Sequence, residues 1–264
     1  MPSFFDYSSF IQDLLSGRRA SMETLAATWR EKELIPYLDL KVPRSIIDLG
    51  SGSLSPQVEI LSRSGHTVVG IDTVNRPVTS LKKFAYAFAR QIYRHQLNAP
   101  KGAGKKCLIC ADVGRLPLAS RQFDLVISCA AFEHFLEIPL IIEELFRVLR
   151  PGGVIWTSIH HFSSLSGGHN AGMRLGPILA LPEGVEPWDH LRSRKTPFSV
   201  PLNEWRVAEY RSAFESRFEV IKFELIGEEG AALLTPEIRA ELSEYTVDEL
   251  TRPTLILAAK KNVP

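Results

Sequence analysis

Short apolar runs alternate along the chain with longer segments that repeat apolar residues at helical spacing. The short runs predict strands at 45–49, 67–72, 107–111, 123–129 and 154–160. The longer segments predict helices at 55–64, 77–96 and 139–149. The second of these carries a stripe of apolar residues at helical spacing that is expected to be buried, and it consists of Leu81, Phe84, Ala85, Phe88 and Ile92. Strands that alternate with helices indicate a parallel sheet with right-handed crossovers. The middle of the chain therefore predicts an α/β core.

Both ends of the chain add elements to this core. Helical stretches precede it at about 7–15 and 22–38. The pattern after it predicts one further helix and two further strands, at about 204–216, 218–226 and 254–259. A helical insert at about 227–252 separates these two strands, with Thr235 as its N-cap and Pro236 at the first helical position.

The segment from Phe162 to Asn203 has no sustained period and is rich in glycine and proline. A non-periodic stretch of this length is typical of a functional lid or of a disordered segment. Its apolar and aromatic residues favour a packed lid, and they are Met173, Leu175, Ile178, Leu179, Leu181, Trp188 and Phe198. We therefore expect four parts: an N-terminal helical cap at 1–43, an α/β core at 44–161, a substrate lid at 162–203 and a C-terminal part at 204–264.

A glycine-containing turn, Asp48-Leu49-Gly50-Ser51-Gly52, follows the first apolar run. Glycine suits such a turn because it carries no Cβ that would block a ligand or penalise an unusual φ. The second predicted strand ends at Asp72, twenty positions after Gly52, where a carboxylate accepts hydrogen bonds from ribose hydroxyls. The first strand-helix-strand unit therefore predicts a nucleoside-binding site, which suits a nicotinamide dehydrogenase or a methyltransferase.

The third and fifth predicted strands favour the second of these classes. The third strand leads into Asp112-Val113-Gly114-Arg115-Leu116-Pro117, and the last core strand is preceded by Arg147-Val148-Leu149-Arg150-Pro151-Gly152-Gly153. With the glycine turn, this series resembles the class I S-adenosylmethionine-dependent methyltransferases. The branch it resembles contains quinone-biosynthesis enzymes and many methyltransferases of sugars, natural products and other small molecules. The resemblance covers roughly residues 44–161.

The resemblance implies a Rossmann-like α/β fold, with a seven-stranded, mostly parallel sheet and helices on both faces. It also implies S-adenosyl-L-methionine as the cofactor. Asp48 and the backbone of Gly50, Ser51 and Gly52 would face its methionine portion, Asp72 the ribose, and Asp112 with the Val113 amide the adenine. Ser128, in the fourth predicted strand, completes the expected cofactor site. In one respect the chain departs from the family, because Leu54 stands where many members have a third glycine.

Histidines follow several of the predicted strands and supply the candidates for catalysis. A hydroxyl acceptor must lose a proton, and histidine is a suitable base at neutral pH. His134, just after the fourth strand, is the first candidate; its alternative role is to orient its loop. His160 and His161 follow the fifth strand, and at most one of them faces the cleft because adjacent strand residues point oppositely. His169 and His190 lie in the lid and are expected at the surface.

Substrate contacts are expected in the cap and the lid, at Trp29, Tyr37, Trp188 and His190. The segment Ser128-Cys129-Ala130-Ala131 lacks the N-P-P-Y pattern of amide or adenine N-methyltransferases and the acidic ligand of metal-dependent catechol enzymes. We therefore expect metal-free methylation of a small organic acceptor, with O-methylation of a hydroxyl on a metabolite, sugar or natural product. A nicotinamide-dependent dehydrogenase and a non-catalytic methyltransferase-like binding protein are the alternatives.

Composition and charge narrow the expected partners. The 264 residues carry a formal net charge of +1, which gives no electrostatic signature of nucleic-acid binding. Three cysteines argue against a disulfide framework and for a reducing compartment. No apolar run approaches the length of about 20 residues needed to span a membrane. We expect a cytoplasmic protein that binds a small molecule and neither nucleic acid nor membrane; a homodimer is left open.

Overall fold

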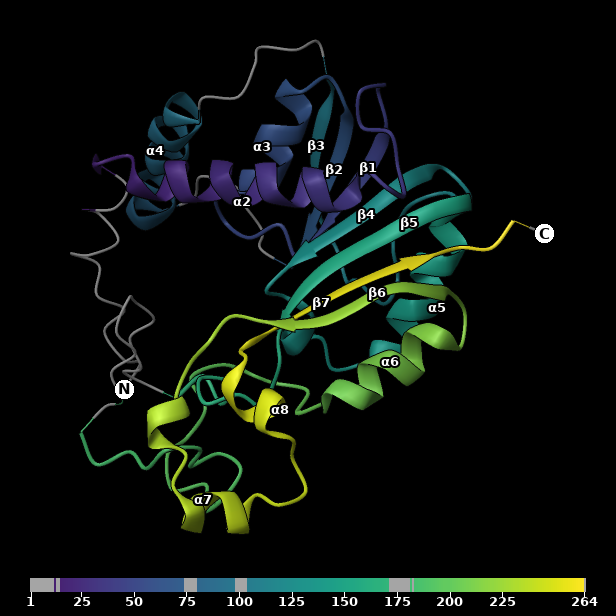
Figure 1. The fold of residues 1–264 in the computed structure, drawn as a ribbon. Coiled ribbons are helices and arrows are strands. Elements are labelled where there is room, and N and C mark those ends of the chain that lie inside the picture. Colours follow the sequence, from purple (N-terminus) through teal and green to yellow (C-terminus); the bar gives the residue numbers. More distant parts are fainter. Residues whose placement is uncertain are drawn as a thin grey trace. The chain divides into compact units, whose positions relative to one another are not determined.

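The computed structural model describes residues 12, 15–73, 80–97, 104–170, 181 and 183–263. Its seven strands form one sheet in the order β3-β2-β1-β4-β5-β7-β6 (Figure 1). The strands are β1 (Ser45–Leu49), β2 (Thr67–Asp72), β3 (Lys106–Cys110), β4 (Phe123–Cys129), β5 (Leu149–His160), β6 (Glu219–Ile226) and β7 (Thr254–Lys260). The predicted seven-stranded, mostly parallel α/β fold is confirmed.

Strand β1 lies between β2 and β4 and runs parallel to both, with Asp48 level with Gly70 on one side and Ile127 on the other. Strand β3 pairs in parallel with the far side of β2. The chain thus builds β1, β2 and β3 toward one edge and then places β4 on the opposite side of β1. In open parallel sheets, ligands bind outside the carboxyl ends of the strands at such a reversal.

The chain divides into two compact units. Among the described residues, the N-terminal unit contains those up to 128, 143–156 and 260–263, and the C-terminal unit contains those of 129–142 and 157–259. The boundaries fall within β4, β5, β7 and helix α5 (Ile138–Val148) rather than in loops. The four parts expected from the sequence do not coincide with it, and they stay predictions.

Helices α2, α3 and α4 belong to the N-terminal unit (Figure 1). Their bounds are α2 (Arg18–Leu34), α3 (Pro56–Arg63) and α4 (Leu81–Gln96). Helix α3 packs against β2 and β3, and α2 packs against α3. The helix predicted at 7–15 falls almost entirely on residues outside the described ranges.

Leu54 is buried in the core formed around these three helices. It belongs to a cluster with Ala20, Ala27, Ile60, Tyr93 and Leu97. The side chain that replaces a glycine of the resembled family is therefore taken up by the helical core. This packing anchors the turn after β1.

A buried ion cluster also joins these elements. Glu59 of α3 is 1% exposed and pairs with Arg94 of α4 at 2.8 Å and with Lys106 of β3 at 2.6 Å. Two cations around one desolvated carboxylate compensate its burial. Helix α4 is thereby connected to α3 and to the edge strand.

One expected apolar stripe is wrong. The spacing of Phe84 and Phe88 on α4 predicts burial, but these side chains are 59% and 62% exposed. The buried positions of α4 lie toward its end, at Tyr93, followed by Leu97 directly after the helix. Helical periodicity identifies an apolar face but does not show that the rest of the protein covers it.

Strand β5 is longer than predicted. It begins at Leu149 and so includes Arg150-Pro151-Gly152-Gly153, which were predicted to precede the strand. Gly152 N–H donates to the Lys261 carbonyl at 2.8 Å, and Lys261 N–H donates to the Gly153 carbonyl at 2.9 Å. These long-range hydrogen bonds extend the strand through a glycine-proline segment that local rules assign to a turn.

The remaining helices follow β4, β5 and β6. They are η1 (Phe132–His134), α5 (Ile138–Val148), α6 (Val207–Glu215), η2 (Ala231–Leu233), α7 (Pro236–Glu241) and α8 (Val247–Thr251). Helix α6 packs against β6. The hydroxyl of Thr235 accepts from Ile238 N–H and Pro236 occupies the first turn of α7, so the predicted helix start in the insert is confirmed.

The described part of the segment 162–203 is packed into the C-terminal unit. Leu165 and Trp188 form an apolar cluster with Ile238, Leu242 and Leu250 of the insert. Residues 171–180 and 182 lie outside the described ranges, so the structure does not test Met173, Leu175, Ile178 and Leu179 as lid residues. Within the described ranges, no helix is long and apolar enough to cross a membrane.

Candidate functional site

The turn after β1 is held against the end of β2. The N–H groups of Gly50 and Ser51 both donate to the Ile71 carbonyl, at 2.9 and 3.0 Å. Gly50 and Gly52 have φ values of 74° and 65°, which L side chains rarely adopt. A Cβ on Gly52 would meet no described atom within 4 Å, so this residue borders open space. The turn therefore presents backbone that a ligand can approach closely.

Asp72, the last residue of β2, is connected to this turn. Its Oδ2 accepts the Gly52 N–H at 2.7 Å. Asp48 and Ser51 are buried beneath the turn, with 2% and 4% of their surfaces exposed. A carboxylate at the end of the second strand beside a glycine turn is the arrangement that binds a ribose in nucleotide-binding α/β folds. The N-terminal unit therefore brings together the residues that are predicted to bind a nucleoside, and that role stays a prediction.

Asp112 and Val113 follow β3, the neighbour of β2. The exposed Asp112 accepts the Gly114 N–H through Oδ1 at 2.8 Å, and Val113 is buried. The aspartate thus shapes its own turn with one oxygen. Ser128 is fully buried, and its hydroxyl donates to the Leu49 carbonyl at 2.8 Å. That bond ties β4 to the end of β1 and supports a structural role for Ser128.

Three histidines lie side by side in the C-terminal unit, and we call them the histidine row. The rings of His134 and His169 are 5.0 Å apart between centroids, and those of His169 and His160 are 4.8 Å apart. His169 Nε2 lies 3.0 Å from His160 Nδ1. His134 Nδ1 lies 3.0 Å from the Pro201 carbonyl, which can only accept a hydrogen bond, so Nδ1 carries the proton and Nε2 a lone pair.

Glu133 lies against this row, with one carboxylate oxygen within 4.8 Å of a ring nitrogen of both His160 and His169. Burial raises the pKa of the Glu133 carboxyl to about 8, and the backbone amides of Glu133 and His160 offset this only in part. Burial and the neighbouring histidines lower the pKa of His160 to about 3 and of His169 to about 4. Both imidazoles are therefore neutral at pH 7.

A tight turn brings His169 to this position. Gly168 packs against the ring of His190, where a Cβ would come within 2.5 Å of His190 Cγ. A Cβ on Gly167 would collide with the carbonyls of His161 and Phe162. His169 itself has a φ of 45°, a left-handed conformation that histidine adopts more readily than most side chains. The small size of Gly167 and Gly168, which we call the glycine pair, thus lets the chain turn back close to the end of β5.

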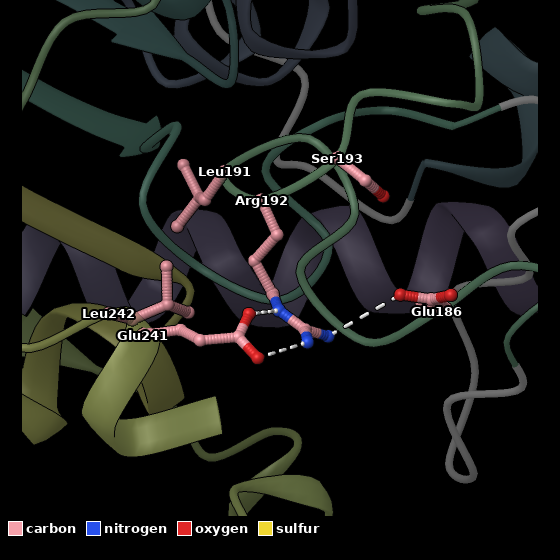
Figure 2. Close-up of a pocket in the computed structure, with 6 residues that line it drawn as sticks. All are labelled: Glu186, Leu191, Arg192, Ser193, Glu241 and Leu242. Atoms are coloured by element: carbon pink, nitrogen blue, oxygen red, sulfur yellow. Dashed lines mark hydrogen bonds and ion pairs between the residues drawn. The ribbon is translucent and has the colours of Figure 1, made fainter. Parts of the chain in front are cut away.

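A separate pocket of about 370 Å³ lies between the segment 183–203 and α7 (Figure 2). Its lining residues are Glu186, Leu191, Arg192, Ser193, Glu241 and Leu242. Figure 2 shows the Arg192 guanidinium between the carboxylates of Glu241 and Glu186, with Nη2 2.9 Å from Glu241 Oε1 and Nη1 3.6 Å from Glu186 Oε2. The arginine is neutralised by these two groups, so the pocket has little to attract an anionic ligand.

Comparison with known proteins identifies the part of the chain that contains the glycine turn. Residues 47–157 match the family described as a methyltransferase domain. Residues 47–157 form a methyltransferase domain. The match includes most of β1, all of β2 to β4 and most of β5.

Two curated relatives match about half of the chain. Malonyl-[acyl-carrier protein] O-methyltransferase from Marinomonas sp. is 43% identical over 139 residues, which cover 52% of this chain and 44% of the relative. Sterol 24-C-methyltransferase from Aspergillus fumigatus is 27% identical over 124 residues, which cover 47% of this chain and 30% of the relative. Each match thus spans less than half of the relative's length.

A solved structure shares the fold over most of the chain. A SAM-dependent methyltransferase from Methanosarcina mazei superposes with a TM-score of 0.52 and 17% identity, covering 88% of this chain and 97% of that one. At this identity the likeness concerns the fold alone.

Several residues predicted to contact the substrate or to catalyse the reaction lie deep inside the C-terminal unit. His161 is fully buried and donates through Nε2 to the Arg252 carbonyl. His190, expected at the surface, is also fully buried and donates to the Phe162 carbonyl at 2.8 Å. Trp188 is 1% exposed and its indole N–H donates to the Leu250 carbonyl at 3.1 Å. These contacts support structural roles for all three.

Two other predicted substrate residues belong to the N-terminal unit. Trp29 is 38% exposed and packs edge-to-face on Trp156, with ring centroids 5.9 Å apart, and Tyr37 is half-buried. Their substrate roles stay predictions. The sequence pattern gave no sign that Glu133 is a functional residue. His169, expected at the surface, is half-buried in the histidine row. The glycine pair before His169 was the available signal, because such pairs mark tight turns.

Proposed function

We propose that this protein binds S-adenosyl-L-methionine at the turn after β1 and transfers its methyl group to a hydroxyl of a small organic acceptor. One observation above all supports S-adenosyl-L-methionine as the cofactor. Gly52 borders open space, and its N–H donates to the carboxylate of Asp72. The Asp72 carboxylate and the half-buried backbone of Gly52 thus lie together at the carboxyl ends of β1 and β2. The match of residues 47–157 to methyltransferase domains supports the same cofactor.

The residues of the N-terminal unit suit the three parts of this cofactor. Gly50 and Gly52 offer backbone to the methionine portion, above the buried Asp48. Asp72 would accept hydrogen bonds from the ribose hydroxyls, which are charge-assisted and therefore strong. Asp112 and the Val113 amide would meet the adenine, one strand further along the sheet.

The histidine row supports oxygen as the methylated atom. Methyl transfer to a hydroxyl releases a proton, and His134 has an Nε2 lone pair held in place by the bond from Nδ1 to Pro201. The Marinomonas relative is an O-methyltransferase, whereas the Aspergillus relative methylates carbon. We also propose a cytoplasmic setting, since the three cysteines are free.

The cofactor proposal predicts a selective rise in melting temperature. S-adenosylhomocysteine, the product form of the cofactor, should stabilise the purified protein, because a ligand at about 100 times its Kd adds about 2.7 kcal/mol to the free energy of unfolding. Differential scanning fluorimetry with this ligand, S-adenosylmethionine and NAD tests it. A shift with NAD alone would favour the dehydrogenase alternative and remove the proposed function.

Asp72 is expected to carry much of the ribose affinity. Asp72→Asn keeps the shape of the side chain but removes its charge, and a hydrogen bond to a charged group contributes about 1.5–3 kcal/mol. The Kd for S-adenosylhomocysteine should therefore rise about 10- to 150-fold in isothermal titration calorimetry. Asp39→Asn, at an exposed position of the same unit, is the matched control. Equal affinities of the two variants would contradict the role of Asp72.

A further inference from the structure

We propose that Glu133, His160 and His169 bind a divalent transition-metal ion, with Zn²⁺ as the preferred metal. All three residues belong to the C-terminal unit, and each offers one ligand atom within 4.8 Å of the others. This site departs from the metal-free reaction expected from the sequence. Metal binding itself does not depend on the proposed function. Only the role of the ion rests on that function, since an ion bound here would hold the oxygen of the methyl acceptor.

The distance between the two histidines fits a shared ion. His160 Nδ1 and His169 Nε2 are 3.0 Å apart. Two ligands about 2.0–2.1 Å from a tetrahedral zinc ion lie about 3.3 Å from each other. To bind a metal ion, the rings of His160 and His169 would therefore have to move apart by only about 0.3 Å. The Glu133 carboxylate is close enough to be the third ligand.

Hydrogen bonds outside the cluster set the tautomer of His160. Ser166 N–H and Oγ–H donate to the two carboxylate oxygens of Glu229, at 2.9 and 2.7 Å. Because the Ser166 hydroxyl proton is used there, its oxygen accepts from His160 Nε2–H at 2.6 Å. Nδ1 is then left with its lone pair toward His169. A histidine that passes its other N–H toward a carboxylate is the usual partner of a bound metal ion.

Glu133 offers a buried carboxyl group as the acidic ligand of the cluster. Its carboxylate is 2% exposed, forms no ion pair within the described ranges, and has no hydrogen bond of normal geometry there. A divalent ion beside this group would favour its ionised form, which is the form that binds a metal. The cluster thus contains one acidic ligand beside two imidazole ligands.

The ligand types select the metal. Two imidazoles and one carboxylate suit Zn²⁺, Fe²⁺ and their neighbours, whereas Mg²⁺ prefers oxygen ligands and retains its waters. Zinc binds more tightly than Fe²⁺ in the general order of affinities. Three protein ligands leave a coordination position for a water molecule or an acceptor oxygen, as in catalytic zinc sites.

Titration of chelator-treated protein tests the site directly. We expect one Zn²⁺ per chain in calorimetry against a competing chelator, visible absorption bands with Co²⁺, and no binding of Mg²⁺. His169→Asn tolerates the left-handed backbone, and Glu133→Gln keeps the side-chain shape; each should weaken Zn²⁺ at least 100-fold. His95→Ala, an exposed histidine on α4, should bind Zn²⁺ like the wild-type chain.

Two outcomes would overturn the site: wild-type protein that binds no Zn²⁺, or equal affinity in the His169→Asn and His95→Ala variants. Glu229→Gln should weaken Zn²⁺ about 10- to 100-fold, as loss of a partner outside the ligand set does. Stabilisation by S-adenosylhomocysteine is measured on the same metal-free protein. If it persists while Zn²⁺ fails to bind, the metal site is lost and the proposed cofactor site stands.

Discussion

Replacement of His134 by alanine is expected to lower the rate of methyl transfer about 100- to 10,000-fold once an acceptor is known. The reason is the tautomer of His134. Its Nδ1–H donates to the Pro201 carbonyl, so Nε2 is the atom that takes the proton from the hydroxyl of the substrate. Single-turnover assays with saturating S-adenosylmethionine measure this step. The Kd for S-adenosylhomocysteine should stay unchanged, because His134 is not among the residues proposed to bind the cofactor.

The chain offers a matched variant for the alternative role of His134. In His134→Asn the side-chain amide can still donate to the Pro201 carbonyl, but the position of Nε2 is empty. If His134 is the base, His134→Asn is as slow as His134→Ala. Recovery of turnover in His134→Asn would show that the bond to Pro201 is what matters and that His134 orients its loop.

Trp188→Ala is expected to lower the free energy of unfolding by about 3–5 kcal/mol. The indole is 1% exposed, packs with residues of the insert such as Ile238 and Leu242, and donates to the Leu250 carbonyl. Its loss would leave a cavity and a buried carbonyl without its partner. Urea unfolding followed by circular dichroism measures the change. Trp188→Phe, which retains most of the volume, should lose less.

This experiment also tests the role of the segment 162–203. A lid that closes over the acceptor would be expected to change the KM of the acceptor when Trp188 is replaced. A raised KM with an unchanged free energy of unfolding would therefore favour the lid and contradict the structural role. The described contacts favour a stability effect.

Local patterns predicted the elements of the core well. Strand β1 and the turn at Gly50 to Gly52 depend on neighbouring residues, and their bounds agree with the prediction. The start of β5 was missed because it is set by hydrogen bonds to Lys261, more than 100 residues away. Burial of Phe84 and Phe88 was wrong because coverage of a helix face depends on the rest of the fold.

The two candidate sites differ in the same way. The cofactor residues follow consecutive strands at fixed spacings, so a sequence pattern identifies them. Glu133, His160 and His169 come together only through η1, the end of β5 and a glycine turn. These three residues do not follow a regular spacing along the chain. Their proximity depends on tertiary structure, and no rule based on a single sequence predicts it.

The turn formed by Gly167 and Gly168 has a consequence for the evolution of this protein. Each glycine is restricted by a contact that any side chain would disturb, Gly167 with backbone carbonyls and Gly168 with the ring of His190. Because the turn brings His169 beside His160, we expect a lineage that replaces Gly168 to lose His169 as well. Homologous chains should thus inherit the glycine pair and His169 together or lack both. Genome sequences alone would then sort the homologues of this chain into those with and those without the histidine row.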